Sequence, residues 1–229
     1  MRYRLATLFV FFFLLFFSGC QRIIPPQKIK EGIASFNINY ETSKEENPIV
    51  VLLPKKMKTF FKHNNTATVV EGFFSSFKMI LLTRCDIDRK YAIVRVLDKK
   101  YIYETDLDGK PFGIDQMKPM KITLIDSSFT YKGLKCKIAR IYCPAISQKP
   151  YDVYYTEDID IKNANINSPY YKIPGVLVKF KLKLFNVIMD VELNDIQKQA
   201  VDNSIFEIPK NNYKYVSLDE LEKIINQFQ

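Results

Sequence analysis

The sequence predicts a mainly β (α+β) protein: a single curved antiparallel sheet with a C-terminal helix against its concave face. Apolar and polar residues alternate with a period of two along most of the chain, which is typical of half-buried strands. Short turn sequences separate these segments, and only the last segment has helical periodicity. With 229 residues, 47% of them apolar and 14% aromatic, the chain can form a sizeable core. We therefore expect one domain with about ten strands.

Residues 33–40 give the clearest early strand, because Ala34, Phe36 and Ile38 alternate with polar neighbours. Turn sequences such as His63-Asn64-Asn65 join consecutive segments, so neighbours in sequence are expected to pair antiparallel. The strands expected up to the middle of the chain are residues 33–40, 57–62, 66–70, 77–85, 91–97, 100–105, 121–125, 129–142 (turning at Lys132-Gly133) and 151–156.

A strong hairpin signal follows in residues 176–184 and 187–193. Apolar side chains alternate with lysines such as Lys181 on the first strand, and with Asp190 and Glu192 on the second. Lysines opposite carboxylates favour antiparallel pairing. We expect the whole sheet to have one dry and one solvated face.

The chain ends in the one convincing helix, residues 217–228. Ser217 and Glu220 form a capping box, and apolar residues recur at helical spacing after them. A shorter helical turn is expected at residues 196–201.

The N-terminal sequence has the pattern of an export signal. Arg2 and Arg4 precede an apolar run over residues 5–17, which is too short to span a bilayer and ends in Ser18-Gly19-Cys20. This pattern looks like the lipobox of bacterial lipoproteins, in which Cys20 is lipidated. The expected organisation is a signal peptide (1–19), a lipidated tether (20–31) and a half-barrel domain (32–229). The alternative is an uncleaved anchor helix.

The expected location is the cell envelope, lipid-anchored through Cys20, on the periplasmic side of the outer membrane. Loss of Arg2 and Arg4 would lower the formal charge from +9 to +7. Nucleic acid is not expected as a partner of an exported lipoprotein. The basic surface fits either simple solvation or contact with anionic lipid or polysaccharide.

Neither a metal site nor an enzyme is expected. The single histidine, His63, lies in an asparagine turn, and no CxxC pair, phosphate-binding loop or nucleophile elbow occurs. Cys136 and Cys143 on one extended segment would be too far apart for a disulfide, so any bridge would use Cys85; three free thiols are the alternative. Asp106-Leu107-Asp108-Gly109 is interpreted as a plain turn, and the acidic residues around Asp158 as a weak cation candidate.

The inner face of the sheet is the remaining candidate for function. Its side chains would line a cavity for an acyl chain or another apolar molecule, larger than about 300 Å³ and with residues 163–175 at its mouth. The alternative is a non-catalytic envelope interaction or structural protein with a filled core and an envelope protein partner. The expected lining residues are Phe36, Ile38, Phe61, Met79, Leu81, Val178, Phe180 and Met189.

Four stretches together resemble the GLPGLI-type lipoproteins of Bacteroidetes. Residues 170–177 (YYKIPGVL) are similar to the Gly-Leu-Pro-Gly-Leu-Ile signature, with Lys-Ile in place of Gly-Leu. Residues 132–137 (KGLKCK), 151–159 and 202–209 (DNSIFEIP) resemble further conserved segments of that group. The resemblance covers most of residues 32–229. It implies a LolA-like half-barrel and brings no catalytic residues or cofactor.

Overall fold

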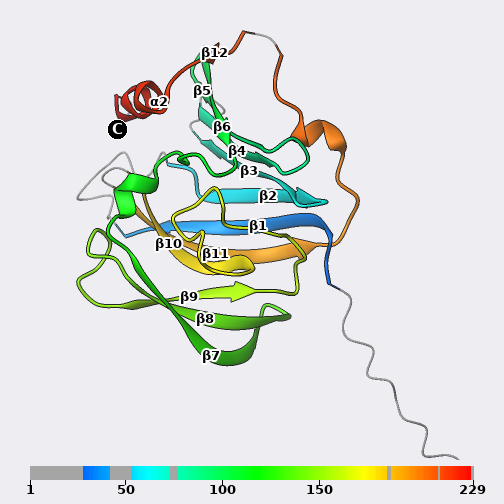
Figure 1. Ribbon diagram of the computed structural model, residues 1–229, viewed down its shortest axis with the longest axis vertical. Helices are drawn as coiled ribbons and strands as arrows, with labels where there is room; N and C mark the ends of the chain where they lie inside the picture. The colour runs from blue at the N-terminus through cyan, green and yellow to red at the C-terminus, as the bar shows by residue number, and fades with distance from the viewer. Residues whose placement is uncertain (1–27, 42–52, 73–76, 185–186, 211, 228–229) are drawn as a thin grey trace, which may run out of the picture.

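The chain folds into one large, open, curved sheet of 12 strands (Figure 1). This is seen in a computed structural model that describes residues 28–41, 53–72, 77–184, 187–210 and 212–227. The mainly β architecture with one sheet is therefore confirmed. All neighbouring strands pair antiparallel except the two-residue β12, which lies parallel to β6.

The strand order is β12-β6-β5-β4-β3-β2-β1-β11-β10-β9-β8-β7. The strands are β1 (Glu31–Tyr40), β2 (Lys56–Lys62), β3 (Asn65–Gly72), β4 (Phe77–Arg84), β5 (Arg89–Val96), β6 (Lys99–Asp106), β7 (Lys121–Tyr131), β8 (Leu134–Tyr142), β9 (Tyr151–Thr156), β10 (Val176–Leu184), β11 (Val187–Gln197) and β12 (Lys214–Tyr215). Two 3-10 helices, η3 (Ile114–Met117) and η4 (Asn203–Phe206), and the helix α2 (Leu218–Asn226) complete the described elements.

The late hairpin has the predicted register. Lys179 lies opposite Glu192 and Lys181 opposite Asp190, and the Lys181 ammonium is 3.1 Å from the Asp190 carboxylate. The alternate side chain Phe180 faces Val191 on the other side of the pair. The pattern of lysines against carboxylates thus identified both the pairing and the buried face.

The inner face of the sheet carries most of the core. On one half Phe36 and Met57 belong to a large buried cluster, and on the other Met79 and Val94 pack together with α2. Val70 contacts both clusters, so the core is continuous along this face. The helix packs at the β4–β6 end of this face, and side chains of connecting segments, such as Met117, Ile159 and Tyr170, belong to the cluster on the other half.

The outer face is not uniformly solvated, which corrects the expectation of one wet face. The connection from β11 to β12 crosses it, and Val201 and Phe206 pack there on Leu82, Ile93 and neighbouring side chains. Strand β5 is consequently buried on both faces.

Two local expectations have different outcomes. Ser217 caps α2 as predicted, with its hydroxyl accepting from the Glu220 amide at 3.2 Å; position 228, the expected end, lies outside the described residues. The expected helical turn at 196–201 is wrong, because Ile196 pairs with Ala34 and extends β11. The turn occurs later, as η4, where the Asp202 side chain accepts from the Ser204 amide.

The domain begins slightly before the expected boundary. Ile29, assigned to the tether, is buried and pairs with Ile159. The expected signal peptide and Cys20 lie outside the described residues. No helix within the described ranges is long and apolar enough to cross a membrane.

Candidate functional site

An apolar cavity of about 200 Å³ lies on the inner face of the sheet. Side chains from β1, β2, β3, β4, β10 and β11 form its wall, joined by Phe112 before η3 and Ile225 of α2. Residues 167–169 border it as part of the β9–β10 connection. The cavity is smaller than the expected 300 Å³, because loops and α2 fill much of the concave side.

The eight expected lining residues divide into two groups. Ile38, Met79, Leu81 and Met189 line the cavity. The others are buried in the packed core outside it: Phe36, Phe61, Val178 and Phe180. Phe36 and Phe180 are in edge-to-face contact, with ring centroids 6.2 Å apart, so their rings fill space that a ligand would need.

Several cavity residues could not be predicted from the alternation of the strands. Phe112 follows the β6 turn, and the preceding sequence gives no sign that it folds back over β4 and β5. A hydrogen bond of 3.3 Å from the Gly113 amide to Glu222 of α2 connects this segment to the helix. The helix and the β6–β7 connection therefore form one side of the cavity together.

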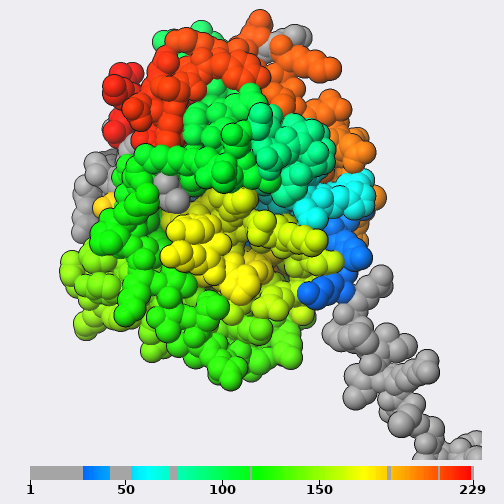
Figure 2. All heavy atoms as spheres, viewed as in Figure 1, coloured from blue at the N-terminus to red at the C-terminus, as the bar shows by residue number. Residues whose placement is uncertain are grey.

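The β9–β10 connection lies across the concave side, where Figures 1 and 2 show it in yellow in front of the sheet. Tyr170, fully buried, anchors it: its hydroxyl donates to the Lys181 carbonyl and lies 3.1 Å from the Tyr151 hydroxyl. Burial raises the pKa of Tyr170 well above 10, so this hydroxyl stays protonated. The connection is thus a fixed roof where a mouth was expected at residues 163–175, and of this stretch only residues 167–169 border the cavity.

Two further contacts hold the roof. Asn165 is buried, and its side-chain amide donates to the carbonyls of Ile173 and Gly175, both at 2.8 Å. The buried ammonium of Lys90 donates to the carbonyls of Leu107 at 2.9 Å and Ile166 at 3.3 Å. The Asn165 bonds join two parts of the roof to each other, and the bond from Lys90 to Ile166 joins the roof to β5.

Most polar side chains at the cavity have partners within the protein. The Tyr40 hydroxyl donates to the Pro54 carbonyl, and the Thr68 hydroxyl is 3.0 Å from that of Thr59. The side-chain nitrogen of Asn167 differs, since it is buried and has no hydrogen-bond partner among the described residues. The wall of the cavity is therefore mostly apolar, and one residue in it, Asn167, has an unsatisfied donor.

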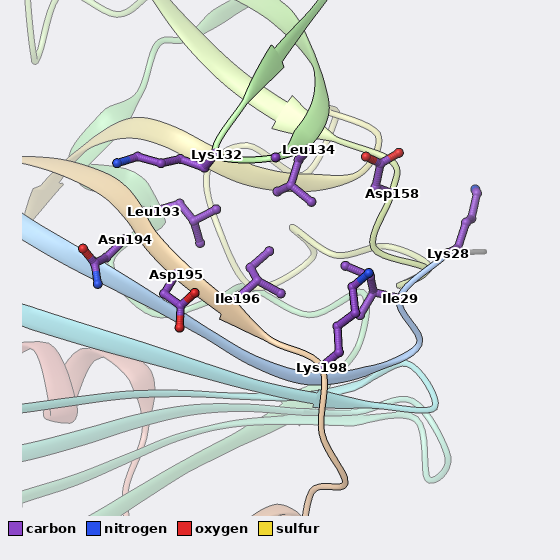
Figure 3. Close-up of a pocket in the computed structure, with 11 residues that line it drawn as sticks. Lys28, Ile29, Lys132, Leu134, Asp158, Leu193, Asn194, Asp195, Ile196 and Lys198 are labelled. Carbon is purple, nitrogen blue, oxygen red and sulfur yellow. The ribbon is translucent and has the colours of Figure 1, made fainter. Parts of the chain in front are cut away.

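A second, polar pocket of about 350 Å³ opens where the chain enters the fold (Figure 3). Its floor includes Leu134 and Ile196, and three lysines and two aspartates surround it. Figure 3 shows the ammonium ends of Lys28 and Lys132 on opposite sides of the pocket. With Asp158 also on the rim, the charges do not converge on one point, so this pocket is a weaker candidate site than the apolar cavity.

The cysteines form no reactive centre. Cys85, Cys136 and Cys143 are free thiols in this structure. Burial raises the pKa of Cys136 to about 11, which keeps its thiol protonated at neutral pH.

The acidic candidates are engaged elsewhere. Asp158 accepts from the Lys135 amide at 2.7 Å, and Glu157 pairs with Lys137 at 3.0 Å. Within the described ranges, no group of three or more His, Cys, Asp or Glu residues is arranged to hold a metal ion.

The comparisons with known proteins define the fold and nothing more specific. No protein-family model and no curated protein matches the chain. The structure is similar to PNGF-II solved in space groups C2 (TM-score 0.53, 11% identity) and P21 (TM-score 0.54, 10% identity). Each match covers 86% of this chain but only 33–34% of PNGF-II, so the chain spans about a third of that protein's length.

MucB is a more distant neighbour. Its TM-score is 0.32 at 10% identity, over 82% of this chain and 60% of MucB, which is too low to support an argument.

Proposed function

We propose that this protein is a non-enzymatic, lipid-anchored lipoprotein of the cell envelope that binds an apolar ligand in the cavity of a LolA-like half-barrel. The cavity on the inner face carries the proposal. Its wall is almost entirely apolar, and exposed apolar surface costs about 25 cal/mol per Å². An apolar ligand that covers this surface would recover that free energy.

The size of the cavity limits the size of the ligand that it can hold. A volume of 200 Å³ is below the roughly 300 Å³ at which typical small-molecule sites begin, but above the roughly 150 Å³ of an engineered cavity that binds benzene. The proposed occupant is therefore a short alkyl segment or a single ring that is one part of a larger apolar molecule, such as the end of an acyl chain or the phenyl ring of an apolar dye. Met57, Met79 and Met189 in the wall suit segments of varied shape, because their side chains are flexible.

The proposed setting follows from the N-terminal sequence. Cys20 would carry the lipid and hold the domain on the periplasmic side of the outer membrane, as in the GLPGLI-type lipoproteins that the sequence resembles. The second candidate function is interaction with another envelope protein, by a domain whose core is filled. The small volume of the cavity favours this second function.

A pair of tryptophan variants tests the binding proposal. Leu81 lines the cavity, whereas Ile80, its neighbour on β4, packs on the outer face. The chain has no tryptophan, so each variant has a single indole reporter. We expect Leu81→Trp to weaken binding of the neutral dye N-phenyl-1-naphthylamine about tenfold, equivalent to roughly 1.4 kcal/mol of lost contact. Ile80→Trp should bind the dye as the parent protein does.

Fluorescence titration of the chain from Gln21 onward measures this effect, since every described strand and core residue lies after that point. Native mass spectrometry of the same material checks for a co-purified apolar molecule. If the dye binds neither the parent nor the variants and no such molecule is present, the interaction-protein function replaces the binding function.

A further inference from the structure

The unsatisfied amide of Asn167 is unusual for its position. Buried polar groups in proteins nearly always have hydrogen-bond partners, because an unpaired one destabilises the folded state. Asn167 lines the apolar cavity, and its side-chain nitrogen is buried without a partner among the described residues. A stability argument alone would favour leucine at this position.

The backbone on both sides of Asn167 is fixed, so the unpaired amide does not result from a loose loop. On one side, the Ile166 carbonyl accepts from Lys90 and the Asn165 carbonyl accepts from the Ser168 amide at 2.9 Å. On the other, the Ser168 hydroxyl accepts from the amide of the fully buried Tyr170 at 3.0 Å. The roof therefore holds Asn167 in place at the cavity.

We propose that the cavity ligand carries an acceptor oxygen, the carbonyl of an uncharged acyl ester or amide, and that this oxygen accepts a hydrogen bond from Asn167. The inference rests on the proposed binding function and specifies the ligand class for the same cavity. The amide nitrogen only donates, so it requires an acceptor. An acyl group combines such an oxygen with the apolar chain that the remaining wall requires.

Asn165 provides a matched control on the same loop. Both of its amide hydrogens have carbonyl partners, so Asn165→Leu leaves the Ile173 and Gly175 carbonyls unpaired and should lower the melting temperature by several degrees. Asn167→Leu removes no internal bond and should leave the melting temperature unchanged or raise it. If Asn167→Leu is destabilised as strongly as Asn165→Leu, the Asn167 amide is satisfied within the protein and the proposal is wrong.

The ligand test uses two uncharged chains with equal numbers of non-hydrogen atoms, methyl octanoate and undecane. Each competes with N-phenyl-1-naphthylamine for the chain from Gln21 onward and for its Asn167→Leu variant. We expect the parent protein to prefer the ester by about threefold to tenfold over undecane, the range of one neutral hydrogen bond. The variant should lose this preference while it still binds undecane.

The outcomes separate the two proposals. If neither chain displaces the dye because nothing binds in the cavity, the binding function itself fails. If both chains bind equally to the parent protein, the binding function stands and the role of Asn167 is refuted. The role of Asn167 is also refuted if the Asn167→Leu variant still prefers the ester over undecane.

Discussion

At the scale of single residues, Lys90 links the strand sheet to the roof of the cavity. The residue is 2% exposed, and its ammonium donates to two backbone carbonyls, with no carboxylate of the described residues in ion-pair contact. Burial lowers the pKa of Lys90, and the charge of Asp108 opposes this shift only partly. The folded state therefore binds the lysine proton less tightly than the unfolded chain does.

This difference predicts a pH dependence of stability. The unfolded chain keeps the proton up to the ordinary lysine pKa of 10.5, whereas folded Lys90 releases it at lower pH. Stability from this group thus rises with pH between the lowered pKa and 10.5, and falls as the solution is acidified through that window. In Lys90→Met the two carbonyls lose their donor at every pH. This loss changes the unfolding free energy of the variant by the same amount at every pH, so it does not affect the slope of the difference.

Urea unfolding of both proteins at a series of alkaline pH values up to 10.5 measures the effect. We expect the unfolding free energy of the parent protein, minus that of Lys90→Met, to increase steadily across this range. A difference that stays flat would mean that Lys90 titrates normally in the folded protein.

The strand pattern predicted cavity residues only in part, for a physical reason. Alternation assigns Ile38 and Phe36 equally to the inner face. Which of them borders open space depends on what packs above: Phe36 contacts the Phe180 ring in the packed core, whereas Ile38 lines the cavity. Asn167 lies in an irregular connection, where periodicity gives no signal at all.

At the scale of elements, Gly175 explains one part of the signature-like segment at residues 170–177. Gly175 has φ +85°, and an added Cβ would lie 2.3 Å from the Thr156 carbonyl oxygen. The glycine therefore allows the β9–β10 connection to return closely against β9 before β10 begins. Gly175 therefore has a structural role in positioning the roof.

Gly175→Ala should consequently destabilise the protein by about 3 kcal/mol, from left-handed backbone strain together with the steric overlap. Gly133 is a matched control, with φ +75° and nothing within 4 Å of an added Cβ. Gly133→Ala should cost only the backbone strain, about 1 kcal/mol. Thermal unfolding of the two variants measures the difference. Equal melting temperatures would show that the close approach of Gly175 to Thr156 does not occur.

The end of β11 shows why one element was mispredicted. Residues 196–201 contain apolar residues at spacings that fit a helical turn, but Ile196 gains a cross-strand partner in Ala34 that lies far away in sequence. Such tertiary pairing overrides weak local propensity. The Ser217 cap of α2, by contrast, is a local interaction and was predicted correctly, whereas the Glu220 side chain pairs with Lys214 instead of completing the predicted capping box.

At the scale of the whole molecule, the sequence predicted the strands but not how the sheet is completed. Strand β1 pairs on one side with β2 and on the other with β11, so it connects the first and second halves of the chain. Alternation reveals a buried face but not a partner distant in sequence. The cavity volume was overestimated for a related reason: the strands define a concave face, and how far loops fill it depends on packing.

The N-terminal sequence also predicts how the whole molecule is held in the cell envelope. If Cys20 is the lipidated residue of a lipobox, Cys20→Ser should abolish incorporation of labelled palmitate and release the protein from washed membranes. Two or more acyl chains hold a protein firmly on a bilayer, whereas one chain gives only marginal binding. Cys85→Ser is the matched control, since Cys85 is a free thiol within the folded domain, and it should stay labelled and membrane-bound. An uncleaved anchor helix over residues 5–17 predicts the opposite: Cys20→Ser remains on the membrane, and neither variant differs in labelling from the parent protein. Fractionation combined with palmitate labelling therefore distinguishes an anchor made of lipid from one made of protein.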